Sequence, residues 1–152
     1  MNQITNYYAV TDSLSTSGQP AAADFAAIAA AGFEAVVNLA MPTSENALPN
    51  EGAIVADLGL VYVHIPVVWE APTLADVDVF FRVMQALASR KVWVHCALNY
   101  RVSCFVYLYQ KHVLNLPEEQ ARFPMAKIWQ PDGVWAQLVA DVEQNYPRVA
   151  DD

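Results

Sequence analysis

The sequence is poor in cysteine and in basic residues, and both shortages narrow the classes of protein to which it can belong. Its two cysteines, Cys96 and Cys104, are too few for the disulfide framework of a small secreted domain, so we expect a reducing, cytoplasmic setting. Eight lysines and arginines stand against sixteen aspartates and glutamates, which gives a formal net charge of −8. Nucleic acids and anionic membrane surfaces bind clusters of basic residues, so we expect neither as a partner.

Long apolar runs and metal-binding patterns are missing as well. No stretch reaches the ~18 consecutive apolar residues of a membrane-spanning helix, and the first residues lack the basic and apolar parts of a secretory signal. The three histidines are scattered along the chain, and no Cys-x-x-Cys pair occurs. We therefore expect no metal site and no cofactor.

The sequence does contain apolar segments whose patterns alternate between those of strands and those of helices. Hydrophobic residues make up 55% of the 152 residues, which is enough for a single domain that spans residues 1–152. Strands are predicted at residues 7–11, 33–39, 61–65 and 92–95. Helices are predicted at residues 21–31, 51–59, 74–89, 101–113, 118–129 and from 133 onward, with a turn at 15–20 and a loose tail at 147–152. This alternation predicts an α/β fold with a small central, mostly parallel sheet flanked by helices.

The stretch from residue 92 to residue 103 holds the residues most suited to chemistry. A buried strand ends at His95, Cys96 opens a short loop, and Arg101 stands at the start of the next predicted helix. A strand–loop–helix unit directs backbone N–H groups and the positive end of the helix dipole at one point, where an anion can bind. A cysteine in that field favours its thiolate form. Cys96 is therefore a candidate nucleophile, and Arg101 is a candidate clamp for an oxyanion.

A purely structural role is the alternative for each of these residues. Free cysteines are among the most buried residue types, so a cysteine after a core strand is usually packed. We expect such packing for Cys104, which lies inside the next predicted helix. An arginine at a helix start, however, is unfavourable against the dipole unless an anion accompanies it. The His95–Cys96 pair, the short loop, Arg101 and Ser103 together favour the functional interpretation.

These motifs give the chain a resemblance to a known family. It resembles the bacterial dual-specificity-phosphatase-like members of the cysteine-based tyrosine phosphatase superfamily. It is most similar to the small phosphatase-like domains found alone or fused to β-lactamase-like hydrolases, which are related to phosphatase-like domains of NAD kinases. The similarity extends over residues 17–20, 32–39, 62–66, 69–73 and 94–103. It implies a tyrosine-phosphatase-like fold and a hydrolase that cleaves a phosphomonoester, of a protein or a small molecule, through a cysteinyl-phosphate.

The resemblance also implies roles for single residues. Cys96 would attack phosphorus, Arg101 would bind two phosphoryl oxygens, and His95 would orient and support the thiolate. Ser103 would stabilise the thiolate when it departs. The remaining phosphoryl contacts would come from the backbone N–H groups of the loop and the helix start, which belong to Ala97, Leu98, Asn99, Tyr100 and Arg101.

The family also implies a carboxylic acid on a neighbouring loop, which would protonate the leaving oxygen and then activate water. Glu70 occupies the corresponding loop, although the family typically uses aspartate there. Asp76 is the alternative acid. Its position three residues after Thr73, at the start of the next helix, already fits a capping box.

The length of the loop between nucleophile and arginine leaves two further functions open. Four residues separate Cys96 from Arg101, one fewer than is usual in the superfamily, and the loop contains no glycine, although Asn99 can adopt a left-handed conformation. Rhodanese-type sulfurtransferases share this spacing and carry a persulfide on the cysteine, but they favour glycine where Asn99 stands and need no acid loop. A catalytically weak anion-binding or regulatory domain is the third interpretation. The expected ligand is a phosphorylated substrate or a small oxyanion, while the sequence indicates neither the substrate's identity nor the oligomeric state.

Overall fold

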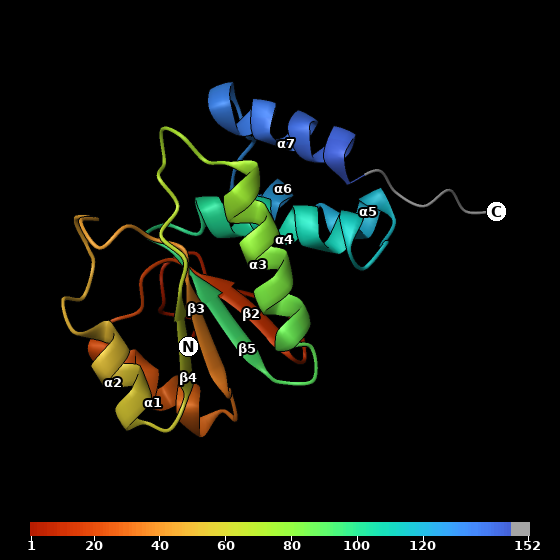
Figure 1. Cartoon of the computed structure of the whole chain (residues 1–152). Helices are drawn as coiled ribbons and strands as arrows, with labels where there is room; N and C mark the ends of the chain where they lie inside the picture. The colour runs from red at the N-terminus through yellow and green to blue at the C-terminus, as the bar shows by residue number, and fades with distance from the viewer. Residues whose placement is uncertain (147–152) are drawn as a thin grey trace.

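A computed structural model describes residues 1–146 and contains a central five-stranded sheet. Its strands run in the order β1–β2–β5–β3–β4, with β1 antiparallel to β2 and the other neighbours parallel (Figure 1). Because β5 lies between β2 and β3, the residues that follow it emerge at the middle of the sheet's carboxyl edge. The strands are β1 Tyr8–Thr11, β2 Leu14–Ser17, β3 Ala35–Asn38, β4 Val61–His64 and β5 Val92–His95.

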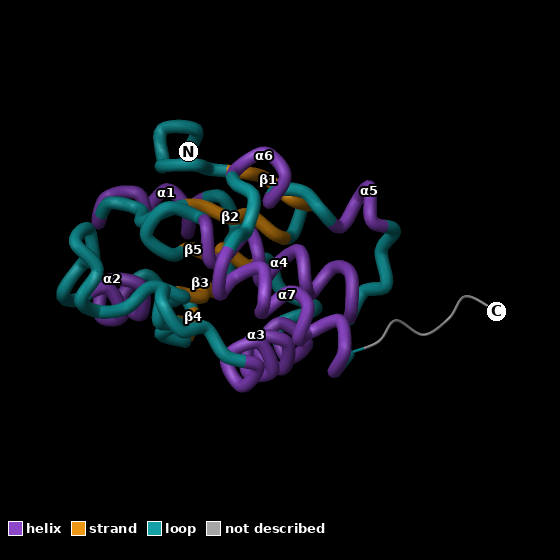
Figure 2. Tube along the Cα trace, turned by 90° about the horizontal axis from the view of Figure 1, so that it is seen from above, coloured by secondary structure: helices purple, strands orange, loops and turns teal. Residues whose placement is uncertain are grey.

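Helices cover both faces of the sheet, as the sequence predicts. Figure 2 shows α1 (Ala22–Ala30) and α2 (Glu51–Asp57) on one face, and α3 (Leu74–Ala86), α4 (Tyr100–His112) and α7 (Gly133–Asn145) on the other. The short helices α5 (Glu118–Ala121) and α6 (Met125–Ile128) connect α4 to α7. The predicted fold class, α/β with a small and mostly parallel sheet, is therefore confirmed.

Strand β5 is buried on both faces because its side chains alternate between two apolar cores. Val92 and Val94 pack in the core formed with α3, α4 and α7, whereas Trp93 packs in the core on the opposite face. His95 shares the face of Trp93, and its ring lies 6.1 Å from that of Phe25 in α1. A strand enclosed from both sides gives firm support to the residues that follow it.

Helix α4, which begins at the far end of the candidate loop, is also enclosed by the rest of the protein. All residues from Arg101 to Gln110 are buried. A helix buried on all sides is apolar around most of its circumference, and the sequence of α4 has this character. The loop between β5 and α4 is thus held at both ends by core elements.

The segment at residues 15–20 was predicted as a turn, and this prediction is wrong for its first half. Leu14–Ser17 forms strand β2, whose backbone pairs in parallel with β5. The polar side chains are accommodated because they find partners: the Ser17 hydroxyl accepts the indole N–H of Trp93, and the Thr16 hydroxyl accepts an amide N–H of Asn99. Hydroxyl-rich residues can therefore occupy a central strand here.

The single helix predicted at residues 118–129 is also wrong, because the structure has two short helices, α5 and α6, in that range. Pro124 lies between them, and a proline in a helix interior removes a hydrogen-bond donor. The tail at residues 147–152, which was predicted to be loose, lies outside the described residues. No helix within residues 1–146 is both long enough and apolar enough to cross a membrane.

Candidate active site

Strand β5 places Cys96 at the carboxyl edge of the sheet, at the mouth of the loop that leads into α4. Cys96 is only 1% exposed, whereas Leu98 at the tip of the loop is 46% exposed. Asn99 adopts the left-handed conformation that the sequence allows it, with φ 69° and ψ 8°, and this turns the chain into α4. The structure thus brings the predicted nucleophile close to the start of the helix.

The backbone N–H groups of residues 97–101 have no hydrogen-bond acceptor among the described residues. Unpaired N–H groups at the first turn of a helix, together with the positive end of its dipole, form a binding site for an anion. These are the residues that the sequence predicts to bind phosphate through their backbone, and each has an N–H group free of an acceptor within residues 1–146. Their contact with a phosphoryl group stays a prediction.

Within residues 1–146, Arg101 has no anionic partner of the kind that a buried cation requires. The residue is 9% exposed, and its Nη1 atom lies 3.5 Å from the backbone oxygens of Leu39 and Val67. In the part of the chain that the structure describes, no carboxylate lies within ion-pair distance of it. Burial of an unpaired charge is costly, so a bound oxyanion would offset the cost of keeping Arg101 in this position.

A pocket of about 180 Å³ lies over these groups and is lined by Trp69, Cys96, Ala97, Leu98, Tyr100 and Arg101. Its lining joins the nucleophile, the cation and aromatic rings in one small volume. A larger hollow of about 480 Å³ lies along α5 and α6 and is lined from residues 118–131. That hollow contains no cysteine and no buried charge, so we place the candidate site at the smaller pocket.

Aromatic rings form one wall of the pocket. The Trp69 ring lies 6.2 Å from that of Tyr100 and 5.4 Å from that of Trp129, while Tyr100 and Trp129 stack at 5.2 Å. The guanidinium carbon of Arg101 lies 5.9 Å from the Trp69 ring. Trp135 donates its indole N–H to the backbone oxygen of Trp69 at 2.9 Å, which fixes the wall to α7. Rings beside a cation suit a flat group attached to the bound anion.

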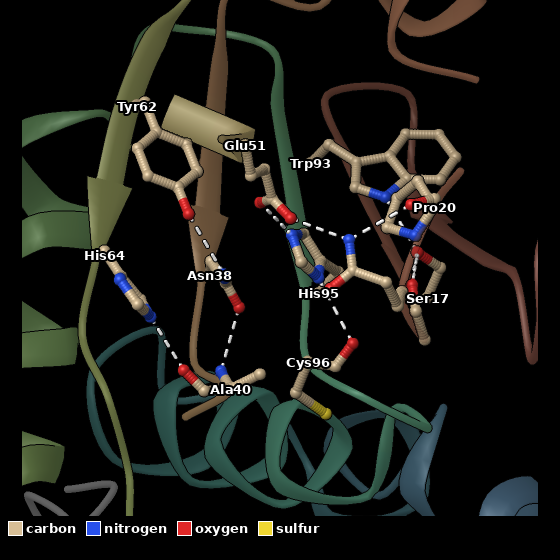
Figure 3. A network of polar contacts seen from close by, with 12 residues as sticks. Ser17, Pro20, Asn38, Ala40, Glu51, Tyr62, His64, Trp93, His95 and Cys96 are labelled. Atoms are coloured by element: carbon tan, nitrogen blue, oxygen red, sulfur yellow. Dashed lines mark hydrogen bonds and ion pairs between the residues drawn. The ribbon is translucent and has the colours of Figure 1, made fainter. Parts of the chain in front are cut away.

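Behind the loop, a buried carboxylate contacts His95. Oε2 of Glu51 lies 2.6 Å from Nε2 of His95, and Nδ1 of His95 lies 3.2 Å from the backbone oxygen of Cys96 (Figure 3). Gln19 donates to the other carboxylate oxygen at 2.6 Å. Burial raises the pKa of Glu51, but its interactions with His95, Gln19 and Tyr62 outweigh burial and hold the pKa below its ordinary value. His95 therefore contacts both a carboxylate and the backbone of the nucleophile.

Sequence reasoning missed Glu51 as a functional residue. It follows Asn50 at the start of a predicted helix, where an acidic residue is expected for its effect on the helix dipole alone. The sequence feature that could have indicated such a residue is His95, because a histidine at the end of a buried strand needs a polar partner for each ring nitrogen. Nothing in the sequence indicates which acidic residue would supply that partner.

The sequence also matches known proteins. Residues 6–112 fit the model of one family, the phosphatase-like domain of β-lactamase hydrolase-like proteins. The chain belongs to this family. A crystal structure of a candidate phosphatase (DUF442) from Shewanella putrefaciens CN-32 is 35% identical to this chain, with a TM-score of 0.85 and 95% of each chain covered. No curated protein matches the chain.

Other solved structures share the fold of the present chain at lower sequence identity. Tk-PTP in its active form is 17% identical over 91% of this chain and 96% of its own, with a TM-score of 0.77. A cysteine-to-serine variant of TpbA from P. aeruginosa, crystallised in complex with pTyr, is 20% identical over 97% of this chain and 85% of its own, with a TM-score of 0.65. The predicted tyrosine-phosphatase-like fold is thereby confirmed. The family agrees with the predicted enzyme class, a phosphoric monoester hydrolase.

The two predicted acids of this phosphatase-like chain lie in different surroundings, and neither is among the described residues that line the pocket. Glu70 is exposed and directly follows Trp69, which does line the pocket. Asp76 accepts the backbone N–H of Thr73 at 3.0 Å, while the Thr73 hydroxyl accepts that of Asp76 at 3.1 Å. This capping box, which the sequence predicts, already occupies Asp76, so Glu70 stays the candidate acid.

Ser103 and Cys104 lie in the first turns of α4. The Ser103 hydroxyl donates to the backbone oxygen of Tyr100 at 3.0 Å and accepts the indole N–H of Trp129 at 3.1 Å. These bonds tie the helix start to the aromatic wall, and a contact of Ser103 with the departing thiolate stays a prediction. Cys104 is fully buried, as expected, and burial raises the pKa of its thiol to about 12. It is an inert core residue at neutral pH.

Proposed function

We propose that the chain hydrolyses phosphate monoesters with Cys96 as the nucleophile and Arg101 as the phosphoryl clamp. The observation that carries this proposal is the buried Arg101, which lines one pocket with Cys96 and has no carboxylate partner within residues 1–146. The unpaired N–H groups of residues 97–101 add donors for further oxygens. Together these groups suit a phosphoryl group, which carries negative charge on several acceptor oxygens.

The proposed reaction has two steps. The Cys96 thiolate attacks phosphorus, the S–P bond forms while the ester P–O bond breaks, and the leaving oxygen takes a proton from Glu70. Water then attacks phosphorus and gives a proton to the Glu70 carboxylate. A new O–P bond forms while the S–P bond breaks, so inorganic phosphate leaves and the Cys96 thiolate is restored. His95, paired with Glu51, supports the backbone at Cys96 in both steps.

The lining of the pocket favours a substrate with one phosphate on a flat, uncharged group. Arg101 alone is basic among the described lining residues, so a second phosphate would lack a cationic partner there. Trp69 and Tyr100 offer rings against which an aromatic leaving group can pack. The pTyr bound to TpbA, a protein of the same fold, is an aryl phosphate, and it supports the same substrate class here.

Hydrolysis of a small aryl phosphate at about pH 5–7 tests this proposal. Wild type, Cys96→Ser and the matched control Cys104→Ser are compared. We expect turnover by wild type and Cys104→Ser, and none above background by Cys96→Ser. Equal background rates for all three proteins would overturn the proposal for aryl phosphates.

A sulfurtransferase is the second candidate, because four residues separate Cys96 from Arg101, as in rhodanese-type enzymes. The same cradle would bind the oxygens of thiosulfate while its outer sulfur passes to the Cys96 thiolate, forming a persulfide and releasing sulfite. Cyanide would then take that sulfur as thiocyanate. Thiocyanate formation by wild type but not by Cys96→Ser would support this candidate. Phosphate binding without either activity would favour the anion-binding interpretation.

A further inference from the structure

Asparagine occupies left-handed backbone positions at Asn6, Asn99 and Asn115, with φ of 50°, 69° and 58°. Glycine takes this conformation at the lowest cost, and asparagine tolerates it better than most other residues. Asn6 and Asn99 meet at the candidate site although they lie 93 residues apart in the sequence. Asn115 lies in the turn after α4, away from the loop between β5 and α4.

Asn6 and Asn99 exchange side-chain hydrogen bonds across the loop. Nδ2 of Asn99 donates to the backbone oxygen of Asn6 at 2.8 Å, and Nδ2 of Asn6 donates to the backbone oxygen of Leu98 at 2.8 Å. Nδ2 of Asn99 also donates to the Thr16 hydroxyl at 3.0 Å, and Asn99 is fully buried. A glycine at position 99 would allow the same backbone turn but none of the Asn99 side-chain bonds.

These bonds decide the direction of the backbone N–H groups in the loop. In a planar trans peptide the carbonyl and the N–H point in opposite directions. Because the Leu98 carbonyl points toward the Asn6 side chain, the N–H of the same peptide, which belongs to Asn99, points away from Asn6. The Ala97 carbonyl is held in the same way by the backbone N–H of Gln19 at 3.0 Å and by Nδ2 of Asn46 at 3.1 Å.

The segment that carries Asn6 is itself firmly anchored. Ile4, on one side of Asn6, is 3% exposed and packs in the core formed with α1 and α2. Tyr7, on the other side, stacks on Trp93 of β5 with ring centroids 5.3 Å apart and planes at 17°. Asn6 therefore reaches the loop from a fixed position, and not from a loose chain end.

We propose that Asn6 and Asn99 are positioning residues that hold the loop in its anion-binding conformation, so that residues 4–7 support the oxyanion site from behind the loop. The two side chains act on the backbone of the loop. Glycine at these positions would leave the turn free to change conformation, whereas the asparagine side-chain hydrogen bonds restrict it to one conformation. This positioning role rests on the proposed function in one respect, namely that the site binds an oxyanion. It predicts that the two side chains raise the affinity for that anion, whichever reaction the bound anion then undergoes.

The variants Asn6→Gly and Asn99→Gly test this proposal, because glycine keeps the positive φ without strain and removes only the side chain. The probe is inorganic phosphate, whose Kd is measured by calorimetry. We expect Kd to rise roughly tenfold in each single variant. In the double variant, the fold-increase in Kd should be smaller than the product of the two single fold-increases, since both side chains contribute to one interaction. With an aryl phosphate, we expect KM to rise more than kcat falls. The control Asn115→Gly makes the same substitution outside the loop and should leave Kd unchanged.

The possible results separate this proposal from the proposed function. If wild type binds phosphate and both glycine variants bind it equally well, the positioning role is overturned while the proposed function stands. If wild type binds no phosphate, both are overturned. If Asn115→Gly weakens binding as much as the other two, the effect is general destabilisation and the positioning role is overturned. The Tm of each variant without phosphate gives the cost to stability.

Discussion

Glu51 and His95 form a buried pair between α2 and the end of β5, with Oε2 of Glu51 2.6 Å from Nε2 of His95. The other ring nitrogen of His95 lies 3.2 Å from the backbone oxygen of Cys96. Both nitrogens thus face oxygen atoms, which fix the orientation of the imidazole ring directly behind Cys96. Through His95, the Glu51 carboxylate connects α2 to the backbone of the candidate nucleophile.

The first prediction concerns the stability that this pair supplies. We expect Glu51→Gln to lower the free energy of unfolding by ~1–3 kcal/mol at neutral pH, because a buried charge-assisted hydrogen bond is weakened. Chemical denaturation measures the free energy of unfolding of each variant. The control is Glu34→Gln, which removes an exposed ion pair with Arg90 and should change stability by less than ~1 kcal/mol. Equal losses in the two variants would contradict a special role for Glu51.

The pH dependence of that stability follows from the lowered pKa of Glu51. A carboxyl whose pKa is lower in the folded state stabilises the fold above its ordinary value of 4.5, and this contribution is lost as the pH falls through the folded pKa. The stability gap between wild type and Glu51→Gln should therefore be largest near neutral pH and shrink as the pH falls below that value. If the stability difference between wild type and Glu51→Gln stayed constant as the pH fell below 4.5, the Glu51 side chain would not be a charged carboxylate in the folded protein.

The identity of the general acid is the subject of the second prediction. If Glu70 protonates the leaving oxygen, Glu70→Gln should lower kcat for an aryl phosphate by about 10²–10⁴-fold, which is the usual contribution of a positioned acid. Asp76→Asn is the matched variant. It should cost ~1 kcal/mol of stability through the weakened cap of α3, with kcat nearly unchanged. The reverse pattern would assign the acid to Asp76.

The sequence was sufficient to predict the elements that carry the loop, because β5 and α4 combine a strong apolar pattern with a sharp break at Cys96. The same reasoning failed at β2, whose residues Ser15, Thr16 and Ser17 are typical of turns. Their hydroxyl groups are tolerated in a central strand only because Trp93 and Asn99 donate to two of them, and such partners are set by tertiary structure.

The site itself was predictable only where neighbouring residues in the sequence form it. Cys96, the loop and Arg101 follow one another, so their meeting required no knowledge of the fold. Glu51 and Asn6 approach from segments that are 44 residues from His95 and 92 residues from Leu98. Their contacts depend on how α2 and the first residues pack against the sheet, which hydrophobic periodicity does not specify.

The third prediction separates the two cysteines by reactivity. Brief treatment of the native protein with iodoacetamide at about neutral pH should modify Cys96, which lines the pocket, and leave Cys104, which is packed in the core, unmodified. Iodoacetamide reacts with the thiolate form of cysteine. Burial raises the pKa of Cys104 to about 12, so almost none of it is ionised under these conditions. Peptide mass spectrometry locates the modification, and excess phosphate should slow it by occupying the pocket. Labelling of Cys104 at a similar rate would show that α4 opens readily.

The last prediction concerns Gly18, which follows β2 and lies against the loop. A Cβ atom at Gly18 would stand 2.7 Å from the backbone oxygen of Ala97, closer than such atoms approach, and 3.2 Å from Cα of Leu98. Gly18→Ala must therefore push the loop away. We expect roughly tenfold weaker phosphate binding, which corresponds to ~1.4 kcal/mol.

Gly32→Ala is the matched control for this change, because Gly32 has φ +92° and nothing lies within 4 Å of its added Cβ. This variant should lose stability by ~1 kcal/mol or more through backbone strain at the end of α1, since alanine is disfavoured at positive φ. It should bind phosphate as wild type does, because nothing near the loop moves. Phosphate titration and thermal unfolding of both variants distinguish the two effects. If Gly18→Ala binds phosphate normally, the loop does not need its present position to hold an anion, and the cradle formed by residues 97–101 would have to be reconsidered.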